Sequence, residues 1–156
     1  MRYSILEIQA FLNQLYGGKP LVVTPYGYTV TFTGLVSPNA TSSQTLGITA
    51  NADFVLTHIK ARTSDTSAQT VSNKNAPYYR VLITDSGSNE QFTNSAVDLE
   101  CCATNGNTMQ GLLPYPRFLS GRTSLTITVT SYTTLVATQN IDLFLEGVLV
   151  RTYSGQ

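Results

Sequence analysis

A strict two-residue alternation of side chains constrains this chain more than any other feature. In residues 124–132, leucine, isoleucine and valine alternate with threonine. A second segment, 26–33, alternates tyrosine, valine and phenylalanine with glycine and threonine. Successive side chains of a β-strand point to opposite faces of the sheet. Both segments are therefore predicted to be strands with one apolar face and one face rich in hydroxyl groups.

Further short runs with strand character follow one another along the chain. We predict strands at 54–59, 78–84, 96–102 and 141–150, and an extended segment at 112–118 in which two prolines exclude a helix. We predict loops at 37–45 and at 62–75, the second with or without a short edge strand, and turns at 85–89, 104–107 and 120–122. Seven or eight short strands separated by turns, with no second helix, predict an all-β sandwich or barrel.

The N-terminal segment has helical periodicity instead. Ser4 and Glu7 form the S-x-x-E pattern of a capping box, and a helix is predicted over residues 5–16. Its apolar residues recur at helical spacing, at Ile5, Ile8, Phe11, Leu12 and Leu15. Gly17 and Gly18 follow as a C-terminal stop. The helix either covers its own sandwich or is an arm that docks on a neighbouring subunit; the domain plan is an arm at 1–18 and a sandwich at 19–156.

Composition explains how such strands face water. The chain has 156 residues, 9 basic and 9 acidic side chains, and no formal net charge. Charged residues make up 12% of it, against about 25% in an ordinary globular domain. Ser, Thr and Asn supply roughly 30% instead. One domain of this length can bury a core, and a neutral chain lacks the basic field that general nucleic-acid binding needs.

The scarcity of charge also bears on assembly. Exposed sheet edges are usually protected by Lys or other charged residues, which prevent pairing with other chains. Because such residues are few here, we expect partner chains to cover edges and outer faces, and we expect a homo-oligomer, either a dimer or a trimer. A solvated, threonine-coated monomer is the alternative.

The residues that could carry chemistry have simpler structural roles. His58 has the parity of Phe54 and Leu56, which predicts a partly buried, hydrogen-bonded histidine on the inward face of a strand, near its end. Cys101 and Cys102 are adjacent on a predicted strand, so they face opposite ways and suit neither a disulfide nor joint metal binding. Cys101 is then the small core residue of the two.

Residues 85–90 resemble an acidic calcium loop but lack its order of ligands, and a tight turn is predicted there. We therefore expect no enzyme activity, no catalytic residue, no cofactor and no bound metal. No apolar run approaches the roughly 18 residues that span a bilayer. No apolar signal region follows the N-terminus. These features predict a protein without a membrane partner that is made in a cytosol.

Four segments of the second half of the chain carry a resemblance to a known class of proteins. They are Tyr-Arg-Val-Leu-Ile-Thr-Asp at 79–85, Leu-Leu-Pro-Tyr-Pro-Arg-Phe at 112–118, Gly121 with the alternating 124–132, and Ile-Asp-Leu-Phe-Leu-Glu-Gly at 141–147. In this order they resemble small jelly-roll or β-sandwich structural proteins of tailed bacteriophage virions, such as capsid cement or decoration proteins and minor head proteins. The resemblance covers about residues 50–150.

The resemblance implies a jelly-roll-like antiparallel β-sandwich with one short N-terminal helix. It implies a non-enzymatic virion protein, made in the bacterial host cytoplasm, that binds the major capsid protein or other virion proteins and does not bind nucleic acid directly. The candidate contact residues are those of the helix face and of the proline-containing segment: Ile8, Phe11, Leu12, Leu15, Pro114, Tyr115, Pro116, Arg117 and Phe118.

Two alternatives follow from the same residues. The nine tyrosines fit a glycan-binding β-sandwich module of a phage tail or surface structure, although no Trp, the commoner sugar platform, is present. An enzyme on a jelly-roll scaffold is the third hypothesis. The cupin type of such an enzyme needs several histidines for its metal, and this chain has one.

Overall fold

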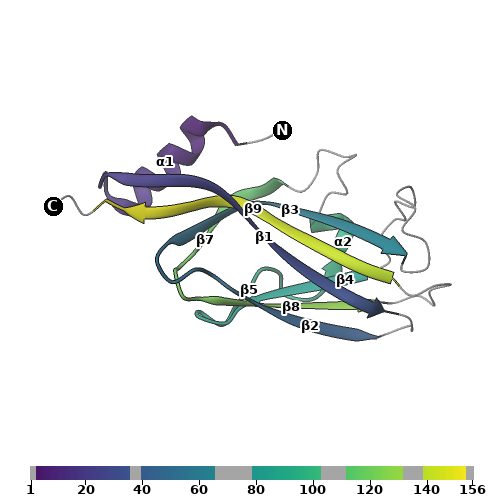
Figure 1. Ribbon diagram of the computed structural model, residues 1–156. Coiled ribbons are helices and arrows are strands. Elements are labelled where there is room, and N and C mark those ends of the chain that lie inside the picture. Colours follow the sequence, from purple (N-terminus) through teal and green to yellow (C-terminus); the bar gives the residue numbers. More distant parts are fainter. Residues whose placement is uncertain (1–2, 36–39, 66–78, 103–111, 132–138, 154–156) are drawn as a thin grey trace.

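The computed structural model describes residues 3–35, 40–65, 79–102, 112–131 and 139–153. In this part of the chain two antiparallel sheets pack face to face, and a helix lies on the outer side of one of them (Figure 1). Sheet A has the strand order β1-β9-β3-β7, and sheet B has the order β2-β8-β4-β5, with β6 also pairing with β4. The predicted all-β sandwich with one N-terminal helix is confirmed.

The elements have the following bounds. Sheet A consists of β1 (Leu21–Leu35), β3 (Asp53–Asp65), β7 (Leu112–Leu119) and β9 (Gln139–Thr152). Sheet B consists of β2 (Thr41–Gly47), β4 (Tyr79–Asp85), β5 (Glu90–Gln91), β6 (Val97–Asp98) and β8 (Ser124–Ser131). The helices are α1 (Ile5–Tyr16) and the single turn α2 (Leu99–Cys102).

The order of the strands is that of a jelly roll. The first strand pairs with the last, β1 with β9, while β2 pairs with β8 in the opposite sheet. Most connections between consecutive strands cross from one sheet to the other, which gives the nested arrangement of a double-sheet jelly roll. The barrel alternative is excluded, because the described strands form two separate sheets.

The core lies between the sheets and follows the predicted alternation. In β8, Leu125, Ile127 and Val129 are fully buried, while the threonines between them are half-buried on the outer face. Tyr79 of β4 is the largest fully buried side chain, and burial raises its pKa to about 12. The period-two pattern thus places the apolar side chains of sheet B against those of sheet A.

The predicted loop at 37–45 is wrong over the residues that can be compared, because β2 begins at Thr41. The polar residues of β2 look like a loop in the sequence, but their hydroxyl groups pair with those of β8. The Oγ1 atoms of Thr41 and Thr130 lie 3.3 Å apart, and Ser43 Oγ lies 2.8 Å from Thr128 Oγ1. Cross-strand Ser and Thr pairs of this kind stabilise a sheet face without apolar side chains.

The predicted strand at 96–102 ends early, and the expectation of no second helix is wrong. β6 covers only Val97 and Asp98, and α2 follows it. In a helical turn residues three apart share a face, so Leu99 and Cys102 pack toward the core and Cys101 is exposed. Cys101 is therefore not the core cysteine that strand parity predicted.

A β-bulge in β3 reverses the predicted orientation of His58. Leu56 pairs with Gly147, but His58 pairs with Glu146, so Thr57 is the extra residue. His58 therefore shares the outer face with Lys60. It is half-buried, and its Nδ1 lies 2.9 Å from the Thr57 hydroxyl, as expected of a hydrogen-bonded histidine.

Helix α1 has the predicted bounds and the predicted cap. The Ser4 N–H donates to Glu7 Oε2 at 2.7 Å and the Glu7 N–H donates to Ser4 Oγ at 3.2 Å. The Ser4 hydroxyl also donates to Glu7 Oε2, at 2.9 Å, and the two bonds that the carboxylate accepts from Ser4 lower the pKa of the Glu7 carboxyl. Gly17 ends the helix in the left-handed conformation, with φ of 62°. None of the described helices has the length and apolar character needed to cross a membrane.

Candidate interaction surfaces

The predicted helix face packs on the outer side of sheet A. Leu12 is buried against Val55 of β3 and Val148 and Val150 of β9, and Ile8 and Phe11 are half-buried around it. Leu15 is 44% exposed. Most of the predicted contact stripe is thus used within the molecule, and the role of α1 as an arm for a neighbouring subunit stays a prediction.

The predicted segment 114–118 lies in β7, which confirms its extended conformation. The Phe118 ring meets the Tyr16 ring of α1 edge to face at 6.3 Å, and the Tyr115 ring meets Phe11 at 5.3 Å. Pro116 is buried, Arg117 and Phe118 are half-buried, and Tyr115 is exposed; the side chain of Pro114 lies outside the described part. The two predicted contact sets therefore lie side by side at one end of the sandwich.

Asp53, at the start of β3, connects α1 and the turn before β8 through hydrogen bonds. Its carboxylate accepts a hydrogen bond from the Tyr16 hydroxyl of α1. It accepts a second one, at 2.8 Å, from the N–H of Gly121 in the turn before β8. Burial, and next the hydrogen bond to Asp53, raise the pKa of Tyr16 above its ordinary value. One carboxylate thus fixes both the end of α1 and the β7–β8 turn.

Exposed apolar side chains lie on α1 and on the strands next to it, on both faces of sheet A. Among the described residues, the exposed large apolar and aromatic side chains are Ile5, Leu6, Leu15, Val22, Val23, Tyr26, Tyr115 and Tyr153. The first three belong to α1, and the next three belong to the first part of β1, whose Leu21 packs against the helix cluster. Val22 and Tyr26 have the parity of the inward-facing Tyr28 and Val30, so they lie on the face of sheet A opposite to α1. Tyr115 contacts Phe11, and the Tyr153 N–H donates to the Pro20 carbonyl. We call these eight residues the α1-end surface.

Only Leu15 and Tyr115 of the α1-end surface were predicted as contact residues. Ile5 lies on the predicted apolar stripe of the helix, but its 76% exposure depends on where the sheet ends beneath α1. The sequence does contain a signal at Val22 and Val23. Two adjacent residues of a strand point to opposite faces, so the two apolar side chains cannot both face the core.

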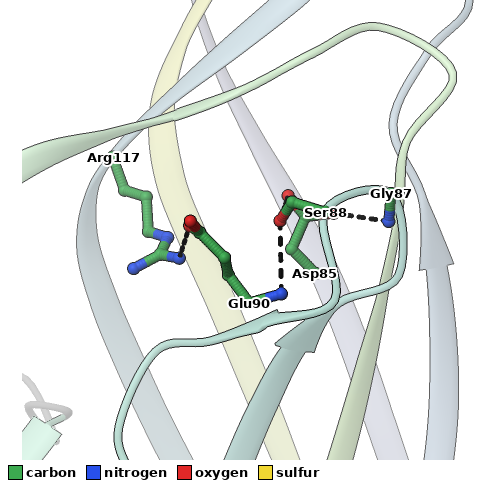
Figure 2. A network of polar contacts seen from close by, with 5 residues as sticks. All are labelled: Asp85, Gly87, Ser88, Glu90 and Arg117. Carbon is green, nitrogen blue, oxygen red and sulfur yellow. Dashed lines mark hydrogen bonds and ion pairs between the residues drawn. The ribbon is translucent and has the colours of Figure 1, made fainter.

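Polar contacts close the side of the sandwich between β7 and β5. The Arg117 guanidinium donates to Glu90 Oε2 at 3.2 Å and lies over the Phe92 ring, 4.1 Å from its centroid. Figure 2 shows the Arg117 and Glu90 side chains directed at each other, next to the turn after β4. In that turn Asp85 accepts the Gly87 N–H at 2.8 Å and the Ser88 hydroxyl at 3.0 Å. The predicted turn at 85–89 is confirmed.

A cavity of about 440 Å³ lies behind this contact, between the two sheets. Its walls are mainly apolar and include Ile59, Val81, Phe92 and Leu113, with Arg117 among the polar lining residues. A volume of this size is in the range of small-molecule sites, but the described lining holds one cation that is already paired with Glu90. We therefore do not assign it a ligand.

The two cysteines provide a test of the corrected α2 assignment. Burial raises the pKa of Cys102 to about 11, whereas Cys101 is exposed. Because the thiolate is the reactive form, iodoacetamide at pH 8 should modify Cys101 at least about tenfold faster than Cys102. Peptide mass spectrometry of a time course measures both rates in one sample, and equal rates would contradict the helical turn.

The described residues contain no group of three or more His, Cys, Asp or Glu side chains placed to hold a metal ion. Polar side chains there engage in cross-strand pairs and turn bonds, as Thr31 does by donating to Asp142 at 2.8 Å. The candidate functional features of the described residues are therefore the exposed apolar side chains and the edge strands of the two sheets.

No protein-family model matches this sequence, and no curated protein matches it either. The class of protein is therefore defined by the structure itself: an all-β, jelly-roll-like sandwich that carries a capped helix on the outer face of one sheet.

Proposed function

We propose that this chain is a non-enzymatic structural protein of a bacteriophage virion, which binds and stabilises the shell of major capsid protein. Double-sheet jelly rolls are common in viral capsid proteins. The outer face of sheet B carries paired hydroxyl groups and the Arg80–Asp98 ion pair, which gives a subunit a polar surface with few charges. The proposal places the mature protein in the virion, after synthesis in the host cytoplasm.

The observation that carries the proposal is the set of exposed apolar side chains that α1 contributes to the α1-end surface, namely Ile5, Leu6 and Leu15. Exposed apolar side chains that gather at one place on a small protein mark a site of protein–protein contact. Ile5 and Leu6 are each 76% exposed on a helix that is otherwise well capped and docked. A shell repeats one subunit many times, so even a modest contact at each site adds up through multivalency.

We expect the double variant Leu6→Glu/Leu15→Glu to lose binding to the capsid. Both side chains are exposed, so the substitutions should leave the fold intact while placing two charges in an apolar contact. The measurement is co-sedimentation with shells assembled from the major capsid protein encoded in the same genome. At least about a tenfold loss of bound protein is expected, since buried unpaired charge costs several kcal/mol.

The matched control is Gln14→Glu, which adds a negative charge at an exposed polar position of the same helix. This variant should bind capsids like the wild type. The proposal fails if the wild-type protein does not sediment with capsids at all, or if the control variant loses as much binding as the double variant.

A glycan-binding function is the second candidate, because three members of the α1-end surface, Tyr26, Tyr115 and Tyr153, are exposed tyrosines. Aromatic rings with a polar group can stack on sugars and donate hydrogen bonds to them, and jelly rolls are also found in lectins. Binding on a glycan array that is lost in Tyr115→Ala, without capsid binding, would favour this function over the first.

A further inference from the structure

The two sides of the sandwich differ in how their edge strands are protected. On one side, β7 contains Pro114 and Pro116, and its pairing with β3 is interrupted between Leu112 and Arg117. On the same side of sheet B the edge strand β5 has two residues, and its Glu90 pairs with Arg117. Prolines, bulges, charges and short strands are the usual means of preventing edge-to-edge pairing, so this side is guarded.

The other side lacks these protections over most of its length. There β1, with 15 residues, is the edge of sheet A, and β2, with 7 residues, is the edge of sheet B. Neither strand contains a charged residue. The guards on β1 are Pro25 and a register shift between Phe32 and Leu35, and between them β1 pairs with β9 without irregularity from Tyr26 to Phe32. In the described part of the chain, β9 is the only strand paired with β1.

We propose that β1 pairs with β1 of a second copy of this chain through residues 27–33, antiparallel and related by a two-fold axis at Val30, so that Thr29 lies opposite Thr31. This inference goes beyond capsid binding and does not depend on it. A second copy is the partner that the edge itself favours, because two-fold pairing brings a strand against its own residues. A charged edge would meet its own charges, whereas this strand meets only uncharged side chains.

The side chains of β1 also match those of a second β1. Thr29, Thr31 and Thr33 alternate along its exposed outer face. The molecule already uses hydroxyl pairs across strands, as at Thr41 and Thr130 in sheet B. Antiparallel pairing of two β1 strands would extend the same kind of hydroxyl ladder across the dimer.

The size of the contact is sufficient for a weak dimer. Residues 27–33 span about 24 Å at about 3.4 Å per residue, and two stacked sheet edges are about 20 Å deep with their side chains. Pairing along this strip covers about 480 Å² on each partner, or about 960 Å² in total, close to the roughly 1,000 Å² that separates specific interfaces from transient ones. The dimer should therefore be concentration-dependent.

Sedimentation velocity over a range of concentrations tests the proposal. We expect the wild-type protein to pass from monomer to dimer as its concentration rises. The variant Thr29→Lys/Thr33→Lys, which places like charges across the two-fold axis, should have a dissociation constant at least about tenfold higher. Its matched control is Gln91→Lys, which adds a lysine to the exposed edge strand of the guarded side and should dimerise like the wild type.

A second measurement on the wild-type protein does not depend on a variant that folds. The β1 amides that do not donate to β9 should exchange with deuterium more slowly at high protein concentration than at low concentration. Unchanged exchange of these amides, a wild type that stays monomeric up to about 1 mM, or a folded lysine variant that dimerises as well as Gln91→Lys would each overturn the proposal. Capsid co-sedimentation of the lysine variant reports separately on the proposed function.

Discussion

Replacing Gly147 by alanine should prevent this protein from reaching its native stability. A Cβ atom at this position would lie 2.0 Å from the backbone oxygen of Val55 and 2.9 Å from the Phe54 ring. β9 pairs with β3 at this point, directly beside the bulge at Thr57. The obstacle is the backbone of a central strand, which cannot move aside without breaking the ladder.

We therefore expect Gly147→Ala to lower the free energy of unfolding by at least about 3 kcal/mol, at the upper end for overpacking. A domain of ordinary stability has about 5–15 kcal/mol in total. Urea denaturation followed by circular dichroism gives the value. The control is Gly47→Ala at the end of β2, where the new methyl group meets no atom within 4 Å; it should change stability by no more than about 0.5 kcal/mol. Equal effects at the two glycines would contradict the described packing of β9 on β3.

The second large effect is expected at Leu12, the buried residue of α1. Its side chain is 2% exposed and covers Val55, Val148 and Val150. Leu12→Ala should lower the free energy of unfolding by about 2–4 kcal/mol, since it opens a cavity between α1 and sheet A. The same urea titration measures it.

The matched substitution for Leu12→Ala is Leu6→Ala, made on the same helix at a side chain that is 76% exposed. Its effect should stay within about 0.5 kcal/mol. If α1 is an arm that leaves the sandwich in solution, both substitutions will be equally mild. A large difference between them shows that α1 is part of the folded domain even when no partner is present.

The local elements with a strong periodic signal could be predicted from the sequence. The capping box and the helical stripe give α1 its observed bounds, and the alternation in 124–132 gives β8. β2 was missed because its Ser and Thr residues look like a loop until β8 supplies their partners. The predicted inward orientation of His58 was wrong because a bulge changes parity, and one inserted residue leaves no signature in the sequence itself.

The candidate surfaces were predicted only in part. Sequence periodicity identified the apolar stripe of α1, but it could not show that Leu12 turns toward the same chain's sheet A. The exposure of Ile5, Leu6 and Val22 depends on which other elements pack against them, which is a property of the tertiary structure. Arg117 was predicted as a contact residue for a partner, and it pairs with Glu90 of its own chain. That pairing is long-range and has no local pattern.

The guarded side at β7 and β5 has a consequence for how far self-pairing can proceed. A sheet with two open edges can add copies at both ends and grow into a fibril. In the proposed dimer the second copy occupies the unguarded edge, and the edges that remain free carry Pro114, Pro116 and the Arg117–Glu90 ion pair. Pairing through β1 therefore closes after two subunits. The Arg117–Glu90 ion pair between β7 and β5 thus also helps to prevent further copies from adding to that side.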